Sequence, residues 1–327
     1  MIKSDYNLIY LCSENARISL KELSRYLKKS PQRLRYSISS LKRDNFIGAP
    51  FCIFDYSYFG LILFRVYFKA GYISEQDKTK IINGLYNNPY IVSIYDLIGE
   101  YDIVIEFACP NSSRFNKELK KITTLTPVLN EYKVVLNIVT HMYPRNYLQN
   151  NINQYNIKSE RIIGGDRDIE KFNVKEMAVM KNLLINPTMR FVDLANKSGL
   201  NIKTTRSIFN ILTKRNIIKG FKHIVNTNKL EINKSRLFLK LHNISIIRED
   251  ELMDHLLKTK EVVQSNKTVG DWDMEVDIEA LDKNEIRNII MQMREEFKDV
   301  IERYNLIEFY NYYKRSYLPL YLFKEES

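Results

Sequence analysis

Basic, amide and hydroxyl side chains collect in two stretches of this 327-residue chain, residues 17–47 and 191–218. Arginine and lysine bind phosphate oxygens and guanine edges, while amide and threonine side chains reach other base edges and the thymine methyl group. Both stretches therefore hold the donors needed to contact a nucleic-acid groove. The candidate contact residues are Ser30, Gln32, Arg33, Arg35, Tyr36, Lys42 and Arg43 in the first stretch and Asn201, Lys203, Thr204, Thr205, Arg206, Asn210 and Lys214 in the second, with Lys28, Arg215 and Lys219 as further phosphate contacts.

Two short helices joined by a tight break are predicted to position the first set. Leu20, Leu23 and Leu27 share one face of the earlier helix. Ser19 and Glu22 have the spacing of a capping box, which predicts where this helix begins.

The later helix begins at Ser30, a favourable N-cap, with Pro31 in its first turn. Leu34, Ile38 and Leu41 are expected to face inward, which leaves the donors toward solvent. A helix with an apolar stripe and exposed donors suits the DNA major groove. The alternative is a pair of amphipathic helices in a small bundle without a ligand.

The second stretch repeats this pattern. Residues 174–185 and 191–198 are the expected first two helices, and Gly199 lies at the break, where a left-handed backbone favours glycine. Asn201 is the expected N-cap of the third helix. The side chains expected to face inward in that helix are Ile202, Phe209 and Leu212.

The positive charge is segregated along the chain, which has a formal net charge of +11 and 45% apolar residues. Residues 1–50 have a net charge of +6 and residues 172–225 of +8, whereas residues 58–148 have +2 and residues 232–323 have −3. A general lysine bias would not divide the charge in this way. Two basic modules, each followed by a nearly neutral one, indicate an acidic partner such as double-stranded DNA.

The cysteines and histidines are too scattered for a disulfide framework or a metal site, so no metal and no cofactor is expected. No apolar run has the length of a membrane span, and residues 1–8 lack a signal peptide's apolar region. A cytoplasmic protein without a membrane partner is therefore predicted. The residues concerned are Cys12, Cys52 and Cys109 and His141, His223, His242 and His255.

After the first helical head, apolar and polar periodicities predict the order β-α-β-β-α-β. This is the ferredoxin-like arrangement, in which two helices cover one face of an antiparallel sheet. The predicted fold class is therefore α+β. The expected elements are strands at 61–70, 91–96, 102–107 and 130–142 and helices at 75–86 and 113–125.

The head and the sheet module together occur twice, at a constant offset of 171 residues. Gly99-Glu100-Tyr101-Asp102 recurs as Gly270-Asp271-Trp272-Asp273, and further pairs are Leu23 and Leu194, Arg35 and Arg206, Asn45 and Asn216, and Arg65 and Arg236. The predicted domains are 1–53 and 172–225 for the heads, 54–148 and 226–323 for the sheet modules, and 149–171 for a polar linker.

These motifs occur twice in the same order, and that order resembles the one found in the Lrp/AsnC (feast/famine) transcriptional regulators. The resemblance rests on Glu22-Leu23-Ser24 and Asp193-Leu194-Ala195 in the second helices and on the two Gly-x-x-Asp turns. It implies sequence-specific DNA binding by the heads and pairing of the sheet modules, here in a fused pseudo-dimer or a homo-oligomer. It also implies an amino acid or other small effector at Gly99, Asp102, Gly270 and Asp273.

Three alternatives remain at this point. The Gly-x-x-Asp turns also suit tight hairpins whose aspartates accept hydrogen bonds from nearby amides. Siroheme decarboxylases resemble the same architecture and would make the chain an enzyme instead of a regulator. A scaffold protein whose heads no longer bind DNA is the third alternative. The first sheet module is further expected to pair with the more acidic second one, within one chain or between two.

Overall fold

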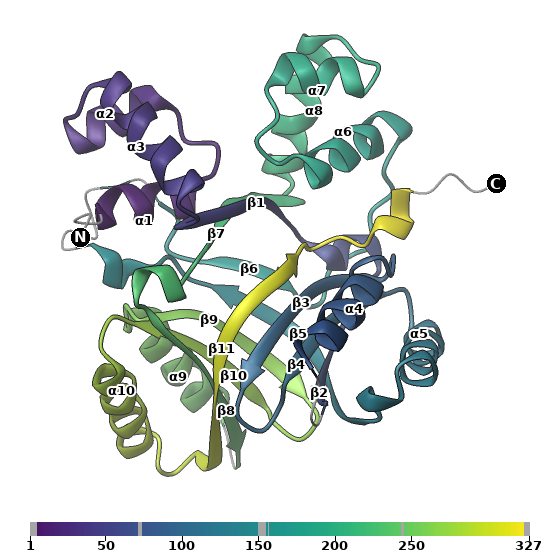
Figure 1. The fold of residues 1–327 in the computed structure, drawn as a ribbon, viewed down its shortest axis with the longest axis vertical. Helices are drawn as coiled ribbons and strands as arrows, with labels where there is room; N and C mark the ends of the chain where they lie inside the picture. The colour runs from purple at the N-terminus through teal and green to yellow at the C-terminus, as the bar shows by residue number, and fades with distance from the viewer. Residues whose placement is uncertain (1–4, 71–73, 150–154, 156, 243–244, 324–327) are drawn as a thin grey trace. The chain divides into compact units, whose positions relative to one another are not determined.

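Two compact units make up the computed structural model, which describes residues 5–70, 74–149, 155, 157–242 and 245–323 (Figure 1). Unit 1 comprises Met1–Ala49, Val139–Ile162 and Lys222–Phe309, and unit 2 comprises Pro50–Ile138, Ile163–Phe221 and Tyr310–Ser327. Each unit therefore combines the helical head of one repeat with the sheet module of the other. The fold is α+β, as predicted.

The head of unit 1 contains three helices, α1 (Tyr6–Glu14), α2 (Leu20–Leu27) and α3 (Pro31–Arg43). The Ser19 hydroxyl accepts a hydrogen bond from the Glu22 amide, and the Glu22 carboxylate accepts one from the Ser19 amide. The predicted capping box is therefore present at the start of α2. At the start of α3, the Ser30 side chain is the N-cap, as predicted.

The head of unit 2 contains α6 (Val174–Ile185), α7 (Phe191–Lys197) and α8 (Ile202–Lys214). Its third helix ends before Asn216, whose φ of 59° matches the φ of 58° at Asn45 in the other head. Asparagine tolerates this left-handed conformation better than most residues. The repeated asparagine thus has a backbone explanation.

Strands β1 (Ile47–Phe54) and β7 (Ile218–Val225) form a two-stranded sheet. In unit 1, the amide of Asn226 donates to the carbonyl of Phe46. Strand β1 leads the chain from unit 1 into unit 2, and β7 leads it back. These two strands account for the exchange of heads between the repeats.

The first sheet module has the strand order β5-β2-β4-β3 of a ferredoxin-like fold. Arg65 on β2 lies opposite Glu106 on β4, and the arginine Nε is 2.7 Å from the glutamate Oε1. The elements are β2 (Ile62–Lys69), α4 (Glu75–Tyr86), β3 (Ile91–Ile98), β4 (Ile103–Cys109), α5 (Ser112–Leu125) and β5 (Glu131–Met142).

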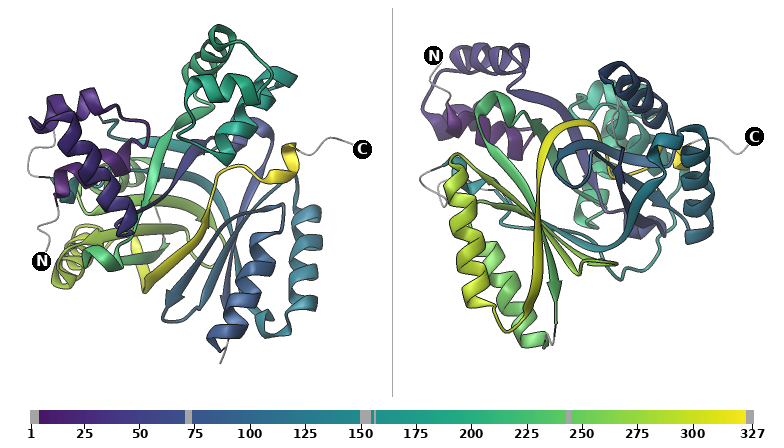
Figure 2. Two further views of the ribbon diagram at one scale, coloured as in Figure 1. Left: turned by 45° about the horizontal axis from the view of Figure 1, so that its top comes forward. Right: turned by 60° about the horizontal axis from the view of Figure 1, so that its bottom comes forward.

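The second module repeats this order as β11-β8-β10-β9, with α9 and α10 side by side on one face of the sheet (Figure 2). Arg236 lies opposite Asp277 with Nε and Oδ1 2.6 Å apart, so the ion pair recurs at the same offset of 171. The elements are β8 (Asn233–Leu241), α9 (Ile246–Lys258), β9 (Val262–Val269), β10 (Met274–Ala280), α10 (Lys283–Glu296) and β11 (Ile301–Arg315).

The last strand of each module also extends the sheet of the other. Strand β5 is paired with β2 and, near its end, with β9, where the Tyr143 amide donates to the Val263 carbonyl. Strand β11 is paired with β8 and then with β3, where the Ser93 hydroxyl donates to the Lys314 carbonyl. Strands β5 and β11 thus each begin in one unit and end in the other.

The segment expected to be a linker contains an unpredicted strand, β6 (Arg161–Gly164), which pairs with β5. Residues 150–154 and 156 of this segment lie outside the described residues. The strand is four residues long and lies between polar residues, so its periodicity is too short to detect. The 3₁₀ turns among the described residues are Tyr56–Phe59, Pro127–Leu129, Asn146–Leu148, Asn228–Leu230 and Leu320–Phe323.

Candidate nucleic-acid interface

Helix α3 turns its predicted donors toward solvent. Gln32, Arg33, Arg35 and Tyr36 are exposed, whereas Leu34 among them is fully buried against the head core. Tyr36 is 71% exposed, so its hydroxyl is accessible from solvent. Helix α3 contains no acidic residue. Its outer face therefore combines positive charge with hydrogen-bond donors.

The expected phosphate contacts of this head surround the same face. Lys28 and Lys42 are exposed. Arg43 is also exposed and pairs with Asp44, with Nε and Oδ1 2.9 Å apart. An exposed ion pair of this kind contributes little stability, so Arg43 can exchange its partner for a phosphate at small cost.

Helix α8 presents a similar face with different residues. Lys203, Arg206, Asn210 and Lys214 are exposed, and Thr204 is half-buried. No acidic residue occurs in α8. The caps have a structural role besides any contact with a ligand, because the Asn201 side chain accepts from the Thr204 amide at 2.8 Å and the Ser30 hydroxyl accepts from the Arg33 amide at 3.4 Å.

For two side chains of α8, the predicted orientation toward solvent or core is wrong. Thr205, predicted as a DNA contact, is fully buried, and its hydroxyl donates to the Asn201 carbonyl at 3.0 Å. Ile202, predicted to face inward, is 41% exposed at the first turn. Thr205 follows Thr204 by one helical step of about 100°, which moves its side chain from the outer face into the core.

Two predicted phosphate contacts in this head are already paired with carboxylates. Arg215 forms ion pairs with Glu170 and with Glu176, the latter at 2.8 Å. The largely buried side chain of Lys219 lies 3.3 Å from the Asp55 carboxylate. Both side chains therefore stabilise unit 2 and are unsuited to the phosphate contacts expected of them.

The Gly-x-x-Asp turns show the hairpin arrangement. The Asp102 carboxylate accepts a hydrogen bond from the Ala70 amide at 2.7 Å, and the Asp273 carboxylate accepts one from the Leu241 amide at 2.8 Å. Gly99 and Gly270 have φ values of 132° and 152°. These contacts explain why the turn recurs. Effector binding at these four residues stays a prediction.

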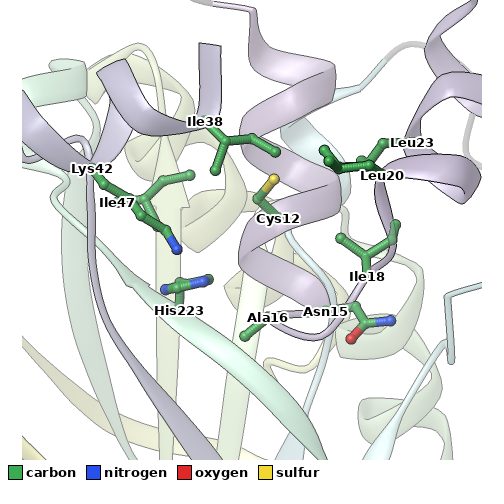
Figure 3. Close-up of a pocket in the computed structure, with 10 residues that line it drawn as sticks. All are labelled: Cys12, Asn15, Ala16, Ile18, Leu20, Leu23, Ile38, Lys42, Ile47 and His223. Carbon is green, nitrogen blue, oxygen red and sulfur yellow. The ribbon is translucent and has the colours of Figure 1, made fainter. Parts of the chain in front are cut away.

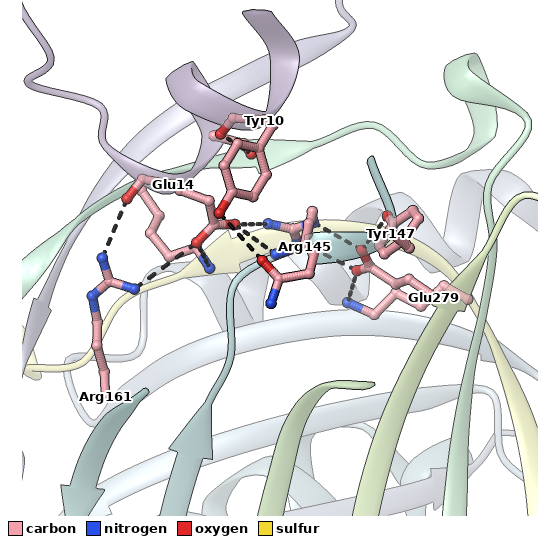
Figure 4. A network of polar contacts seen from close by, with 10 residues as sticks. Tyr10, Glu14, Arg145, Tyr147, Arg161 and Glu279 are labelled. Carbon is pink, nitrogen blue, oxygen red and sulfur yellow. Dashed lines mark hydrogen bonds and ion pairs between the residues drawn. The ribbon is translucent and has the colours of Figure 1, made fainter. Parts of the chain in front are cut away.

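Unit 1 contains a buried network of charges that sequence reasoning missed (Figure 4). The Arg145 guanidinium donates through Nε to Glu279 at 2.8 Å and through Nη1 to Glu14 at 3.3 Å. Lys222 lies 2.6 Å from the other oxygen of Glu14, and Arg161 donates to the Glu14 carbonyl. One arginine thus connects the end of α1 to strand β10.

The charges of this network shift one another's pKa values. Burial would raise the pKa of Glu14, but the attraction of Lys222, Arg145 and Arg161 lowers it below its usual value. Burial, with repulsion from the two arginines opposing the attraction of Glu14, lowers the pKa of Lys222 to about 7. The lysine is therefore the group in the network that changes its charge near neutral pH.

The repeat offers a signal by which this network could have been found. Glu14, Lys222 and Glu279 correspond, at the offset of 171, to apolar residues of the other copy. A position that is charged in one copy and apolar in the other indicates a contact that only one copy makes. The corresponding residues are Ile185, Phe51 and Ala108.

The histidines form ion pairs or hydrogen bonds with other residues of the chain. His141 and His255 pair with Glu160 and Glu296, and the ring of His223 donates from Nδ1 to the Gly48 carbonyl at 2.9 Å. Within the described part of the chain, no group of three or more His, Cys, Asp and Glu side chains is arranged to hold a metal ion. Among the same residues, no helix is long and apolar enough to cross a bilayer.

Comparison with curated proteins finds helix-turn-helix regulators. The chain is 26% identical over 142 residues to the HTH-type transcriptional regulator FL11 of Pyrococcus horikoshii, covering 42% of this chain and 89% of that protein. It is 28% identical over 106 residues to the uncharacterized HTH-type transcriptional regulator PH0061 of the same organism, covering 32% of this chain and 70% of that protein. No family model matches the chain.

The chain is therefore similar in sequence to helix-turn-helix transcriptional regulators. The resemblance read from the sequence is thereby confirmed, together with the α+β fold. Each curated relative matches less than half of this chain, as expected where a unit of this length occurs twice.

A solved structure matches nearly the whole chain. The crystal structure of the siroheme decarboxylase NirDL has a TM-score of 0.57 and 12% sequence identity, and the match covers 97% of this chain and 94% of that one. A likeness at this identity shows a common fold. The same fold can carry different functions, which depend on the residues of the site.

Proposed function

We propose that the protein is a sequence-specific DNA-binding transcriptional regulator of the Lrp/AsnC type. The observation that carries this proposal is that α3 and α8, the third helices of the two heads, both expose basic and amide side chains and contain no acidic residue. A positive helix face of this composition matches the charge and the edge pattern of the DNA major groove. The naming of both curated relatives as HTH-type transcriptional regulators supports the same function.

The two helices would read different sequences. Arg33, Arg35 and Gln32 on α3 and Lys203 and Arg206 on α8 share few side-chain types at corresponding positions. The target in double-stranded DNA would then consist of two unlike half-sites. An amino acid or another small effector, self-association through the sheet modules and a cytoplasmic location belong to the same proposal.

Selection of bound duplexes from random DNA, at two salt concentrations and with and without amino acids, tests this function. The full chain should enrich a defined sequence and lose affinity steeply as salt rises. Charge reversal of Arg33 and Arg35 to glutamate should weaken binding by orders of magnitude. Reversal of Lys117 and Lys120, which are exposed on α5, is the matched control and should change binding little. Full affinity after the first reversal would contradict the proposal.

A second candidate is an enzyme acting on a tetrapyrrole, which the whole-chain fold likeness to NirDL favours. Such a site would be expected to have histidine and arginine around a large planar ligand, whereas His141 and His255 pair with glutamates. An absorbance titration of the full chain with siroheme decides between the two. A saturable shift of the main porphyrin band would support the enzyme, and an unchanged band would support the regulator.

A further inference from the structure

The first head contains a cavity of about 170 Å³ between its three helices and strand β7 (Figure 3). Apolar side chains of all three helices contribute to its wall, together with polar atoms. Lys42 and His223 lie close together at one side of the cavity. The lining residues are Cys12, Asn15, Ala16, Ile18, Leu20, Leu23, Ile38, Lys42, Ile47 and His223, all of unit 1.

The second head shows that this cavity is not required by the fold. At the offset of 171, Cys12 corresponds to Leu183, Leu20 to Phe191 and Ile38 to Phe209, each a larger side chain. Phe191 packs edge-on against Phe209 with ring centroids 5.1 Å apart, and Phe209 stacks on Phe221 at 5.9 Å. The larger residues occupy the corresponding region of the second head.

The polar part of the wall is also particular to the first head. Lys42 corresponds to Thr213 and His223 to Cys52 in the other copy. Burial raises the pKa of Cys12 to about 12 and lowers the pKa of His223, and the charge of Lys42 favours the neutral ring. At neutral pH the thiol and the imidazole are therefore uncharged. None of the lining residues is acidic, so Lys42 is the charged group of the cavity wall.

We infer that this cavity is a binding site for a small monocarboxylate with an apolar body of about six carbon atoms. Its carboxylate would pair with the Lys42 ammonium, and its body would lie against Leu20, Leu23 and Ile38. The size follows from the volume, because an apolar cavity of about 150 Å³ accommodates benzene. The inference concerns binding alone and does not depend on the proposed DNA-binding function.

Histidine resonances give a local test, because the full chain has four histidines. The chain is labelled with ¹³C at histidine Cε1, and the His223 signal is assigned with His223→Gln. Benzoate is the probe, and benzyl alcohol is its uncharged counterpart. Benzoate should shift the His223 signal saturably and leave the other three in place. Benzyl alcohol should bind about tenfold more weakly, since it lacks the charge-assisted contact with Lys42.

Variants that place residues of the second head at the corresponding positions of the first show whether the probe binds in this cavity. Cys12→Leu with Ile38→Phe should abolish the shift, and Lys42→Thr should weaken benzoate binding about tenfold and remove its advantage over the alcohol. Thr213→Lys in the other head is the matched control and should change nothing. Because Lys42 is exposed, its variant tests the site even if the filled variant does not fold. A static His223 signal, an unchanged affinity after filling, or equal affinities for the two probes would each overturn the inference.

Discussion

Arg145 and Glu279 form a buried ion pair in unit 1, with the arginine Nε 2.8 Å from the glutamate Oε2. The guanidinium also reaches Glu14, so a single side chain joins the first head to a strand of the sheet module. In the other copy the matching arginine is Arg315, here at an offset of 170 because the repeat is one residue shorter near its end, and it lies 5.0 Å from the ring of Phe51 instead. The same residue type thus serves as an ionic bridge in one unit and as a cation–π contact in the other.

Arg145→Met should destabilise the protein by about 3–5 kcal/mol, because it leaves two buried carboxylates without their shared partner. Arg315→Met removes the cation–π contacts with Phe51 and Tyr312 and a hydrogen bond to Tyr317, and because it leaves no buried carboxylate behind it should cost about 1–2 kcal/mol. Urea unfolding of both variants measures the difference. Equal losses would show that the buried bridge contributes no more than the ring contact.

The free energy of unfolding should rise with pH above about 7 because of Lys222. Unfolded lysine keeps its proton up to its ordinary pKa of 10.5, whereas in the fold its pKa is lowered to about 7. Between these values the unfolded state binds more protons, which makes the slope positive, at most about 1.4 kcal/mol per pH unit. Below pH 7 both states are protonated and this contribution is constant.

Unfolding of Lys222→Met across pH 6–9, compared with the parent chain, isolates this effect. The variant should lack the rise, since methionine has a similar length and no proton to release. Lys197→Met, at an exposed position, is the control and should keep the parent slope. A parent chain whose stability falls from pH 7 to 9 relative to Lys222→Met would contradict the assignment.

Neighbouring threonines of α8 should separate DNA binding from folding. Thr205 is buried and bonded to its own helix, while Thr204 is half-buried beside the exposed basic residues. Thr205→Val should therefore lower stability by about 1 kcal/mol and leave DNA affinity unchanged. Thr204→Val should change DNA affinity more than stability. Thermal unfolding and DNA-binding titrations on both variants provide the measurement, and the reverse pattern would refute the proposed orientation of the interface.

Lys214 and Lys219 should differ in their effect on the salt dependence of DNA binding. Lys214 is exposed and available to a phosphate, so Lys214→Ala should reduce the slope of log affinity against log salt by about 1. Lys219 lies against the buried Asp55 carboxylate, so Lys219→Ala should keep the slope and lower stability. Identical slopes of log affinity against log salt for both variants would show that Lys214 does not contact the DNA.

Local sequence patterns predicted most of the helices and strands. Helix α4 matches its predicted residues 75–86, because the periodicity of apolar residues marked it. The capping box at Ser19 and the N-caps at Ser30 and Asn201 were also found where predicted. Strand β6 escaped prediction because four residues are too few to establish a period.

What the sequence could not provide were the contacts between distant segments. The pairing of Arg215 with Glu176 and of Lys219 with Asp55 joins residues 39 or more positions apart. A net positive charge in a segment says nothing about which of its cations are already paired. The exchange of heads between the units was equally hidden, because strand partners depend on topology and not on local composition.

The exchanged heads also set the time at which the first one can be completed during synthesis. Its hydrophobic core includes Val225, Leu230 and Ile232, which the ribosome adds some 180 residues after the head itself. At bacterial or eukaryotic elongation rates this delay is roughly 10–40 s. Throughout that interval the nascent chain displays the unfinished core of its first head, which makes it a natural client for ribosome-associated chaperones.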